Sequence, residues 1–87
     1  MANVYILKSI KTKKYYIGST KNFDNRFKEH QKGLVRSTKS LRPFEIKLVQ
    51  EYKTETQAKQ IEFKLKKLKR KDYIEKIIRD GFIKMQI

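Results

Sequence analysis

The chain has 87 residues, of which 38% are hydrophobic and none is cysteine. This length predicts one hydrophobic core and a single domain over residues 1–87. The absence of cysteine excludes disulfide bridges and thiolate zinc sites. It also fits a reducing cytoplasm.

The charge is strongly positive, with 23 Lys and Arg against 9 Asp and Glu and a net charge of +14. Such an excess indicates an anionic partner, with nucleic acid ahead of an anionic membrane surface. The lysine-rich coding of an AT-rich genome explains the same excess, so charge supports nucleic-acid binding without identifying it. Neither a signal peptide nor an apolar run of ~20 residues is recognised, which predicts a soluble, cytoplasmic protein.

The first two elements are predicted to be strands. Residues 3–8 are β-rich and apolar, Lys11–Lys14 suit a hairpin turn, and residues 15–19 then form a second, antiparallel strand. Counting back from a turn near residues 10–12 places Tyr5 and Tyr16 roughly opposite each other, with both hydroxyls on one face of the sheet. Cross-strand aromatic pairs also stabilise hairpins by packing alone, so this alternative stays open.

A helix is expected next, with Asn22 as its N-cap and Gly33 as its end. Its inward face comprises four residues at helical spacing: Phe23, Phe27, His30 and Leu34. Residues 34–43 are polar and basic, which predicts a loop facing the partner. Phe44–Tyr52 then alternates with the period of a third strand.

Two further helices are predicted in the last third of the chain. Thr54–Gln57 matches a capping box, and the long helix after it has an apolar inner face and a lysine-rich outer face. Asp72 is expected to cap the last helix, which ends at Asp80-Gly81, and the apolar tail 82–87 lies against the core or frays. The inner face of the long helix comprises Ala58, Ile61, Leu65 and Leu68, its outer face Lys59, Lys64, Lys66, Lys67 and Lys69, and the apolar stripe of the last helix Ile74, Ile77 and Ile78.

The resulting order is β-β-α-β-α-α. It predicts an α+β fold in which a small, mainly antiparallel three-stranded sheet is flanked by helices.

Three polar residues are candidates for phosphate chemistry. Arg26 and His30 lie at i and i+4 on one helix face, and Arg suits bidentate phosphate contacts while His moves protons near neutral pH. Glu62 adjoins Ile61 and Leu65 at the margin of a buried stripe, where a carboxylate can ligate Mg²⁺. The alternatives are a solvated Arg26–Glu29 pair, a structural His30, and a surface pair of Glu62 with Lys66.

Five short segments occur in order between Asn3 and Lys66, within a similarity that runs from Asn3 to about Arg79: N-V-Y-I-L, Y-Y-I-G-S-T-K, R-F-K-E-H, R-P-F and E-F-K-L-K. This set resembles the GIY-YIG nuclease superfamily, and especially its small stand-alone bacterial members, which are similar to the nuclease module of the excision-repair incision subunit. Asn3-Val4 replaces the Gly-Ile of the first motif and leaves its tyrosine, Tyr5.

The resemblance implies a divalent-metal-dependent DNA endonuclease. It implies that Tyr5 or Tyr16 activates water, that Arg26 stabilises charge at phosphorus, and that His30 assists by hydrogen bonding or proton transfer. Glu62 would hold a single Mg²⁺ or Mn²⁺. The basic residues expected to contact DNA are Lys21, Arg36, Lys39, Arg42, Lys59 and Lys66.

A second hypothesis keeps the fold but not the activity. The chain would then be a non-catalytic or partner-dependent nucleic-acid-binding module, directed to DNA by a targeting protein. The natural DNA substrate, the oligomeric state and the choice between the two tyrosines are open at this point.

Overall fold

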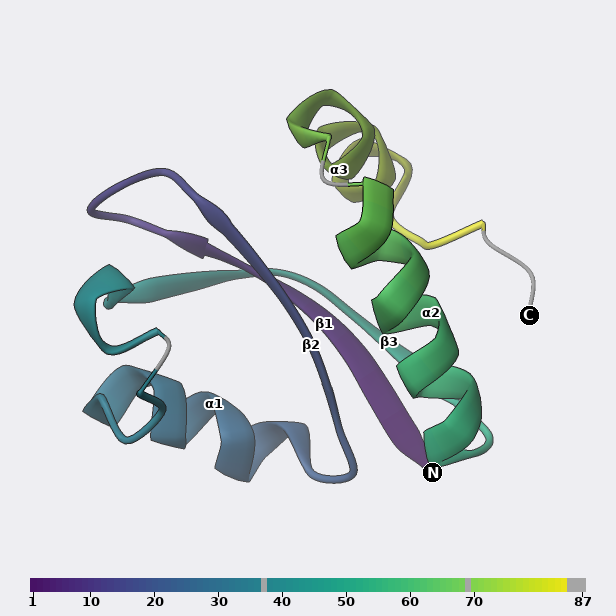
Figure 1. Cartoon of the computed structure of the whole chain (residues 1–87), viewed down its shortest axis with the longest axis horizontal. Coiled ribbons are helices and arrows are strands. Elements are labelled where there is room, and N and C mark those ends of the chain that lie inside the picture. The colour runs from purple at the N-terminus through teal and green to yellow at the C-terminus, as the bar shows by residue number, and fades with distance from the viewer. Residues whose placement is uncertain (37, 69, 85–87) are drawn as a thin grey trace.

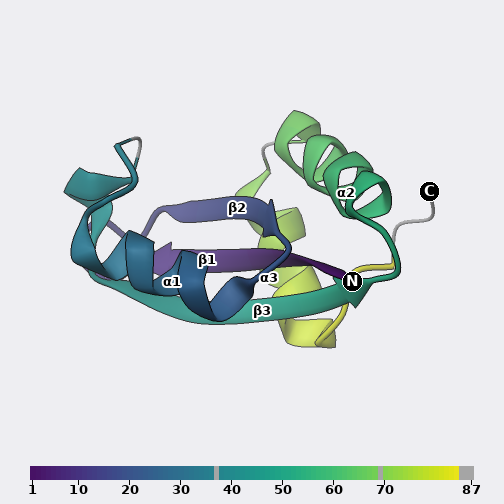
Figure 2. The same ribbon diagram turned by 90° about the horizontal axis from the view of Figure 1, so that it is seen from below.

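A three-stranded antiparallel sheet with strand order β2-β1-β3 divides the helices into two groups (Figure 1). The computed structural model describes residues 1–36, 38–68 and 70–84. Figure 2 shows α1 on one side of the sheet and α3 on the other. The predicted α+β fold and element order are confirmed. The elements are β1 (Ala2–Ser9), β2 (Tyr15–Thr20), α1 (Phe23–Lys32), the short 3-10 helix η1 (Lys39–Leu41), β3 (Phe44–Tyr52), α2 (Glu55–Leu68) and α3 (Lys71–Asp80).

The central strand β1 is covered on both faces, which explains why it is an almost continuous apolar run. On one face, Val4 and Ile6 pack with Ile17 of β2 and with buried residues of α2 and α3. On the opposite face, Tyr5 and Leu7 form a second cluster with Phe44, against which the aromatic residues of α1 pack. The sheet therefore separates an aliphatic core from a smaller aromatic one.

The pairing of β1 with β2 corrects one expectation. Tyr5 lies opposite Gly18 and Tyr16 lies opposite Leu7, so the two tyrosines are diagonal rather than opposite neighbours. The shift arises because the loop closes between Ser9 and Lys14, with Lys13 in a left-handed conformation at φ 65°. A shift of two positions preserves the alternation of faces, so both phenols still lie on one side of the sheet.

Helix α1 begins and ends as predicted. The Asn22 side chain accepts a hydrogen bond from the backbone N–H of Asn25 at 3.1 Å, and Gly33 ends the helix at φ 78°. Leu34 was expected on the inward face, but it is 71% exposed. It follows the left-handed Gly33, so the helical spacing no longer applies to it. The loop at 34–43 also contains η1, which was not expected.

The predicted ends of α2 and α3 need two corrections. Thr54 does cap α2, accepting a hydrogen bond from the backbone N–H of Gln57 at 3.1 Å. Leu68, however, is 41% exposed, because it is the last residue of α2, where the chain turns towards α3. The N-cap of α3 is Arg70 rather than Asp72, since the backbone of Arg70 is still extended. Asp72 lies in the first turn of α3 and forms an ion pair with Arg70.

The start of the C-terminal tail lies against the sheet. Ile83 is buried, and its backbone N–H and C=O both bond to the side chain of Gln50 on β3. The expectations for Lys69 and for residues 85–87 lie outside the described residues. Within the described ranges, no helix combines the length and the apolar character needed to cross a membrane.

Gly18 allows the Tyr5 ring to lie across β2, so a side chain at this position should destabilise the fold. A Cβ atom at Gly18 would lie 2.4 Å from the Tyr5 hydroxyl oxygen and 2.5 Å from Cζ. Because Tyr5 is itself buried, Gly18→Ala should lower the free energy of unfolding by about 1–3 kcal/mol, the usual range for overpacking. Urea unfolding of the purified variant measures this loss.

The matched control for this prediction is a double-mutant cycle with Tyr5→Leu, which removes the ring that the new methyl group would meet. Gly18→Ala should then be clearly less destabilising in the Tyr5→Leu background than in the wild type. Additive effects of the two substitutions would show that the close approach of Gly18 to Tyr5 is not the reason for the glycine.

Candidate active site

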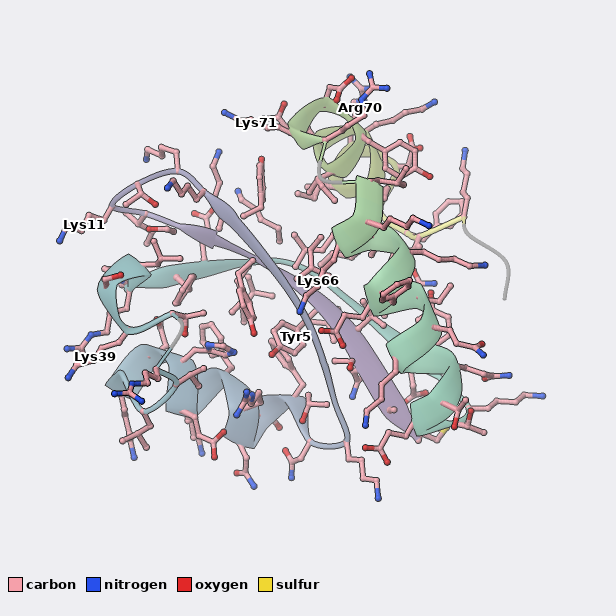
Figure 3. The ribbon with its side chains drawn as sticks, in the orientation of Figure 1. Tyr5, Lys11, Lys39, Lys66, Arg70 and Lys71 are labelled. Carbon is pink, nitrogen blue, oxygen red and sulfur yellow. The ribbon has the colours of Figure 1, made fainter. Side chains whose placement is uncertain are left out.

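Two strands and one helix bring four of the predicted site residues together. Tyr5 on β1 and Tyr16 on β2 point to the face that α1 covers, and α1 supplies Arg26 and His30. The Tyr16 and His30 ring centroids are 5.0 Å apart, those of Tyr5 and His30 are 5.8 Å apart, and those of the two tyrosines 6.3 Å. Tyr5 lies near the centre of the molecule in Figure 3, between α1 and α2.

His30 is buried and has a hydrogen-bond partner on each ring nitrogen. Its Nε2 lies 3.0 Å from the Tyr5 hydroxyl oxygen, and its Nδ1 lies 2.8 Å from Oγ1 of Thr38, which is also buried. The Thr38 hydroxyl lies 3.4 Å from the carbonyl oxygen of Val35. The histidine is therefore a link between strand β1 and the loop that follows α1.

One assignment of protons gives each donor in this group an acceptor. If Thr38 donates to the Val35 carbonyl, its oxygen accepts the proton on His30 Nδ1, and His30 Nε2 is then free to accept from the Tyr5 hydroxyl. The opposite tautomer would leave the Tyr5 proton without an acceptor among the described residues. We therefore assign the neutral Nδ1–H tautomer to His30.

Arg26 extends this group to the surface. Its guanidinium Nη1 donates to Glu29 Oε1 at 3.0 Å, and its side chain is 39% exposed. The guanidinium also lies close enough to the Tyr5 phenol that Arg26 lowers the pKa of Tyr5 and the phenol raises the pKa of Arg26. Arg26 is thus held by Glu29 near the Tyr5 phenol while part of it faces solvent.

Electrostatics keep both buried groups neutral near pH 7. Burial raises the pKa of Tyr5 to about 12, against the smaller lowering effect of Arg26. Burial, followed by the positive charge of Arg26, lowers the pKa of His30 below its usual value. A neutral phenol that donates to a neutral imidazole is consistent with both shifts.

Glu62 on α2 lies beside β2 and is held by two partners. The Ser19 hydroxyl donates to Glu62 Oε1 at 2.5 Å, and the Lys66 ammonium lies 2.7 Å from Oε2. The Glu62 side chain is 20% exposed, so it is neither a core residue nor a free surface charge. Lys66 Nζ also lies 5.6 Å from the centre of the Tyr16 ring. Lys66 therefore links this carboxylate to the tyrosine cluster, which is formed by Tyr5, Tyr16 and His30.

The donor set around Glu62 fits a hard divalent cation with few protein ligands. The described residues contain no cluster of three or more His, Cys, Asp or Glu side chains that could enclose a metal ion. Mg²⁺ commonly takes one or two carboxylates and fills its other positions with water and phosphate oxygens. A single, partly exposed carboxylate that already attracts the Lys66 cation meets this requirement.

The six basic residues expected to contact DNA do not form one patch. Arg36, Lys39 and Arg42 belong to the segment between α1 and β3, and Figure 3 shows Lys39 far from Lys66. Lys21 and Lys59 both pair with Glu55, at 3.5 Å and 3.6 Å. Of the six, Lys66 lies next to the tyrosine cluster through its pair with Glu62.

Two residues of the site were missed in the sequence. Thr38 lies in a polar loop, where a threonine carries no periodic signal, and its contact with His30 arises only from folding. Ser19 follows Gly18, the glycine of the second tyrosine motif (Tyr16-Ile17-Gly18). Its position was therefore a usable signal for a partner of Glu62.

Comparisons with known proteins agree with this geometry. The family model of the GIY-YIG catalytic domain matches residues 1–76. No curated protein matches the chain. Among solved structures, the chain is similar to the solution NMR structure of the UPF0213 protein BH0048 from Bacillus halodurans, with a TM-score of 0.58 and 26% sequence identity over 93% of this chain and 87% of that one. A GIY-YIG catalytic domain indicates a nuclease-type activity, and by this match over most of its length the chain belongs to the GIY-YIG family.

Proposed function

We propose that this chain is a divalent-metal-dependent endonuclease that hydrolyses phosphodiester bonds in DNA. Residues 1–87 would form its single nuclease domain. The observation that carries the proposal is the ordered chain of hydrogen bonds from Thr38 through His30 to Tyr5, whose phenol lies near the partly exposed guanidinium of Arg26. Buried polar networks of this kind are expected where a charged group must be held in one orientation. The net charge of +14 supports an anionic substrate.

In this proposal Arg26 stabilises the negative charge that develops on the phosphate. The ion pair with Glu29 holds the guanidinium near the Tyr5 phenol, so little reorganisation is needed when a phosphate approaches. His30 acts through Tyr5 and Thr38 acts through His30. Tyr5, His30 and Thr38 are therefore positioning residues rather than groups that touch the substrate.

The two tyrosines would have different roles because their surroundings differ. Tyr5 is 1% exposed, and its raised pKa of about 12 keeps its hydroxyl protonated near pH 7, so it has no free base form to accept a proton. Tyr16 is half-buried and lies beside Lys66. We assign to Tyr16 the contact that orients the attacking water. The water oxygen bonds to phosphorus as the bond to the leaving oxygen breaks; the proton that the water loses passes to solvent, and the leaving oxygen takes one up from solvent.

Glu62 is the residue proposed to hold the metal. Nucleases of this family generally depend on a divalent cation, and when bound at Glu62 such an ion (Mg²⁺ or Mn²⁺) would supply Lewis-acid stabilisation of a phosphate oxygen. Ser19 keeps the carboxylate in place, and Lys66 balances its charge when no other cation is present. Under the alternative of a non-catalytic DNA-binding module, the pair of Glu62 with Lys66 would be purely structural.

Glu62→Gln separates these alternatives. The substitution keeps the size of the side chain and removes its charge, so cleavage should fall at least about a hundredfold while DNA affinity stays equal or rises. The assay uses labelled linear, nicked, branched and single-stranded DNA with Mg²⁺, Mn²⁺ or EDTA. Glu51→Gln, an exposed position on β3, is the matched control and should cleave like the wild type. Binding without metal-dependent cleavage by the wild type on every substrate would favour the non-catalytic module.

The second prediction of this proposal concerns Thr38. Thr38→Val keeps the shape but removes the oxygen that accepts the His30 Nδ1 proton, so the tautomer and the Tyr5 contact are no longer fixed. We expect kcat to fall about tenfold with little change in KM, and Thr38→Ser to restore it. Nitrogen-15 NMR of His30 reports the tautomer directly. Loss of activity in Thr38→Val with an unchanged His30 tautomer would contradict the positioning role.

The third prediction follows from the lowered pKa of His30. Because the folded state binds the His30 proton less tightly than the unfolded state, the stabilising contribution is present above the unfolded pKa of about 6.5 and is lost as pH falls through the folded pKa. The free energy of unfolding, measured by urea titration, should therefore decrease from about pH 7 to about pH 5, and the decrease should be smaller in His30→Gln. Equal slopes in the two proteins would contradict this assignment.

A further inference from the structure

A basic groove extends from the candidate site along the outside of β2. It lies between the β1–β2 hairpin and the junction of α2 with α3, and has a volume of about 540 Å³. This size lies within the range of about 300–1,000 Å³ that is typical of ligand pockets. Its rim carries five cationic side chains from three segments of the chain: Lys13, Lys14, Lys66, Arg70 and Lys71.

The charge of this rim is largely unbalanced. None of the described residues that line the groove is acidic. Lys13, Lys14 and Lys71 form no salt bridge with any described residue, whereas Arg70 pairs with Asp72 and Lys66 with Glu62. Three uncompensated cations around one cavity indicate an anionic ligand.

The bottom of the groove is apolar, unlike most of this lysine-rich surface. Ile17, Leu65 and Ile74 line it as core residues that are 9%, 0% and 3% exposed, and the half-buried Tyr16 lines it beside them. Phosphate groups alone would make no use of the Tyr16 ring or of the apolar side chains that line the groove. A base that stacks on the half-buried Tyr16 ring would use this apolar lining, and basic grooves with stacking surfaces are typical of single-stranded nucleic-acid binding.

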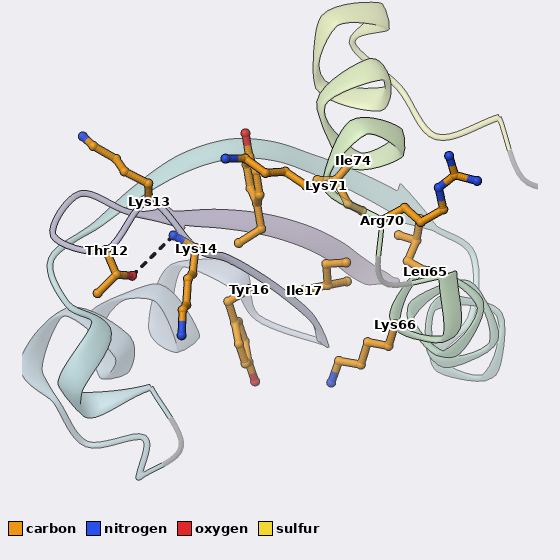
Figure 4. A pocket seen from close by; sticks show the side chains of 11 residues that line it. Thr12, Lys13, Lys14, Tyr16, Ile17, Leu65, Lys66, Arg70, Lys71 and Ile74 are labelled. Carbon is orange, nitrogen blue, oxygen red and sulfur yellow. Dashed lines mark hydrogen bonds between the residues drawn. The ribbon is translucent and has the colours of Figure 1, made fainter.

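The groove is continuous with the candidate site because Tyr16 and Lys66 belong to both. Figure 4 shows the side chains of Lys14 and Lys66 on either side of Tyr16, with their amines directed to the same side as the tyrosine hydroxyl. A strand whose phosphate reaches the Tyr16 hydroxyl can therefore place a neighbouring nucleotide in the groove.

We propose that this groove binds an unpaired nucleotide of the DNA strand that the active site cleaves, with its base on the apolar floor and its phosphates on Lys14 and Lys71. This inference rests on the proposed nuclease function and adds a substrate class to it. A base inside a duplex is stacked on both faces and paired along its edge, so it cannot reach the floor. The enzyme would therefore favour DNA with a single-stranded segment next to the cleavage point.

The test measures binding without cleavage, by fluorescence anisotropy in EDTA. Three fluorescein-labelled DNAs are compared: a blunt duplex, the same duplex with a single-stranded overhang, and the overhang with abasic nucleotides, which keep the phosphates but lack the bases. Wild-type protein should bind the overhang about tenfold more tightly than the other two DNAs. Equal affinity for the normal and abasic overhangs would overturn the proposal, because it would reduce the groove to a phosphate-binding surface.

Two variants of equal charge assign this preference to the groove. Lys14→Ala with Lys71→Ala removes two rim cations, while Lys67→Ala with Lys76→Ala removes two exposed lysines that do not line the groove. The first pair should lose about tenfold in affinity for the overhang and much less for the blunt duplex. The control pair should lose equally on both DNAs. Equal losses on the overhang for the two pairs would also overturn the proposal.

Failure of the groove proposal and failure of the nuclease proposal give different results in these assays. Cleavage of blunt duplex DNA without any preference for the overhang would overturn the groove assignment and leave the nuclease function standing. Preferential binding of the overhang without metal-dependent cleavage of any substrate would support the groove and contradict the nuclease function.

Discussion

The buried imidazole of His30 is the constraint on which the rest of the site depends. An imidazole enclosed among aromatic rings is destabilising unless each ring nitrogen has a hydrogen-bond partner. Tyr5 satisfies Nε2 and Thr38 satisfies Nδ1, and these residues come from the central strand and from the loop after α1. The need to satisfy one side chain thus ties a strand, a helix and a loop together. It also explains why residues 34–43, polar in composition, are anchored at a buried threonine.

The glycine of the second tyrosine motif has an equally local cause. Tyr5 lies across β2 at Gly18, so that its hydroxyl reaches His30 and Arg26 instead of stopping at the neighbouring strand. Any larger residue at this position would push the ring away from both partners. The two tyrosine motifs are therefore one structural unit. Tyr5 from the first motif needs Gly18 from the second, while Tyr16 is left at the more accessible side, next to Lys66.

Charge acts differently from these short-range contacts. Lysines and arginines are spread over the chain, and several of them are already paired, as Lys21 and Lys59 are with Glu55. The fold selects a smaller set by bringing the hairpin loop next to the junction of α2 and α3, where the described residues that line the groove include no acidic side chain. Local geometry, rather than total charge, decides which of these residues can act together on one strand of nucleic acid.

The sequence by itself determined the elements and their order, because helix caps, alternating strands and apolar spacing depend on neighbours within a few residues. Asn22, Gly33 and Thr54 act where their chemistry predicts. It also determined the family, since the two tyrosine motifs and the Arg26–His30 helix are read in order along the chain. Only the tertiary structure decided the strand register, the burial of His30, the contact of Glu62 with Ser19 and the contact of His30 with Thr38. These features join residues far apart in sequence, and their energies depend on burial and on distances of a few ångströms, which no local pattern encodes.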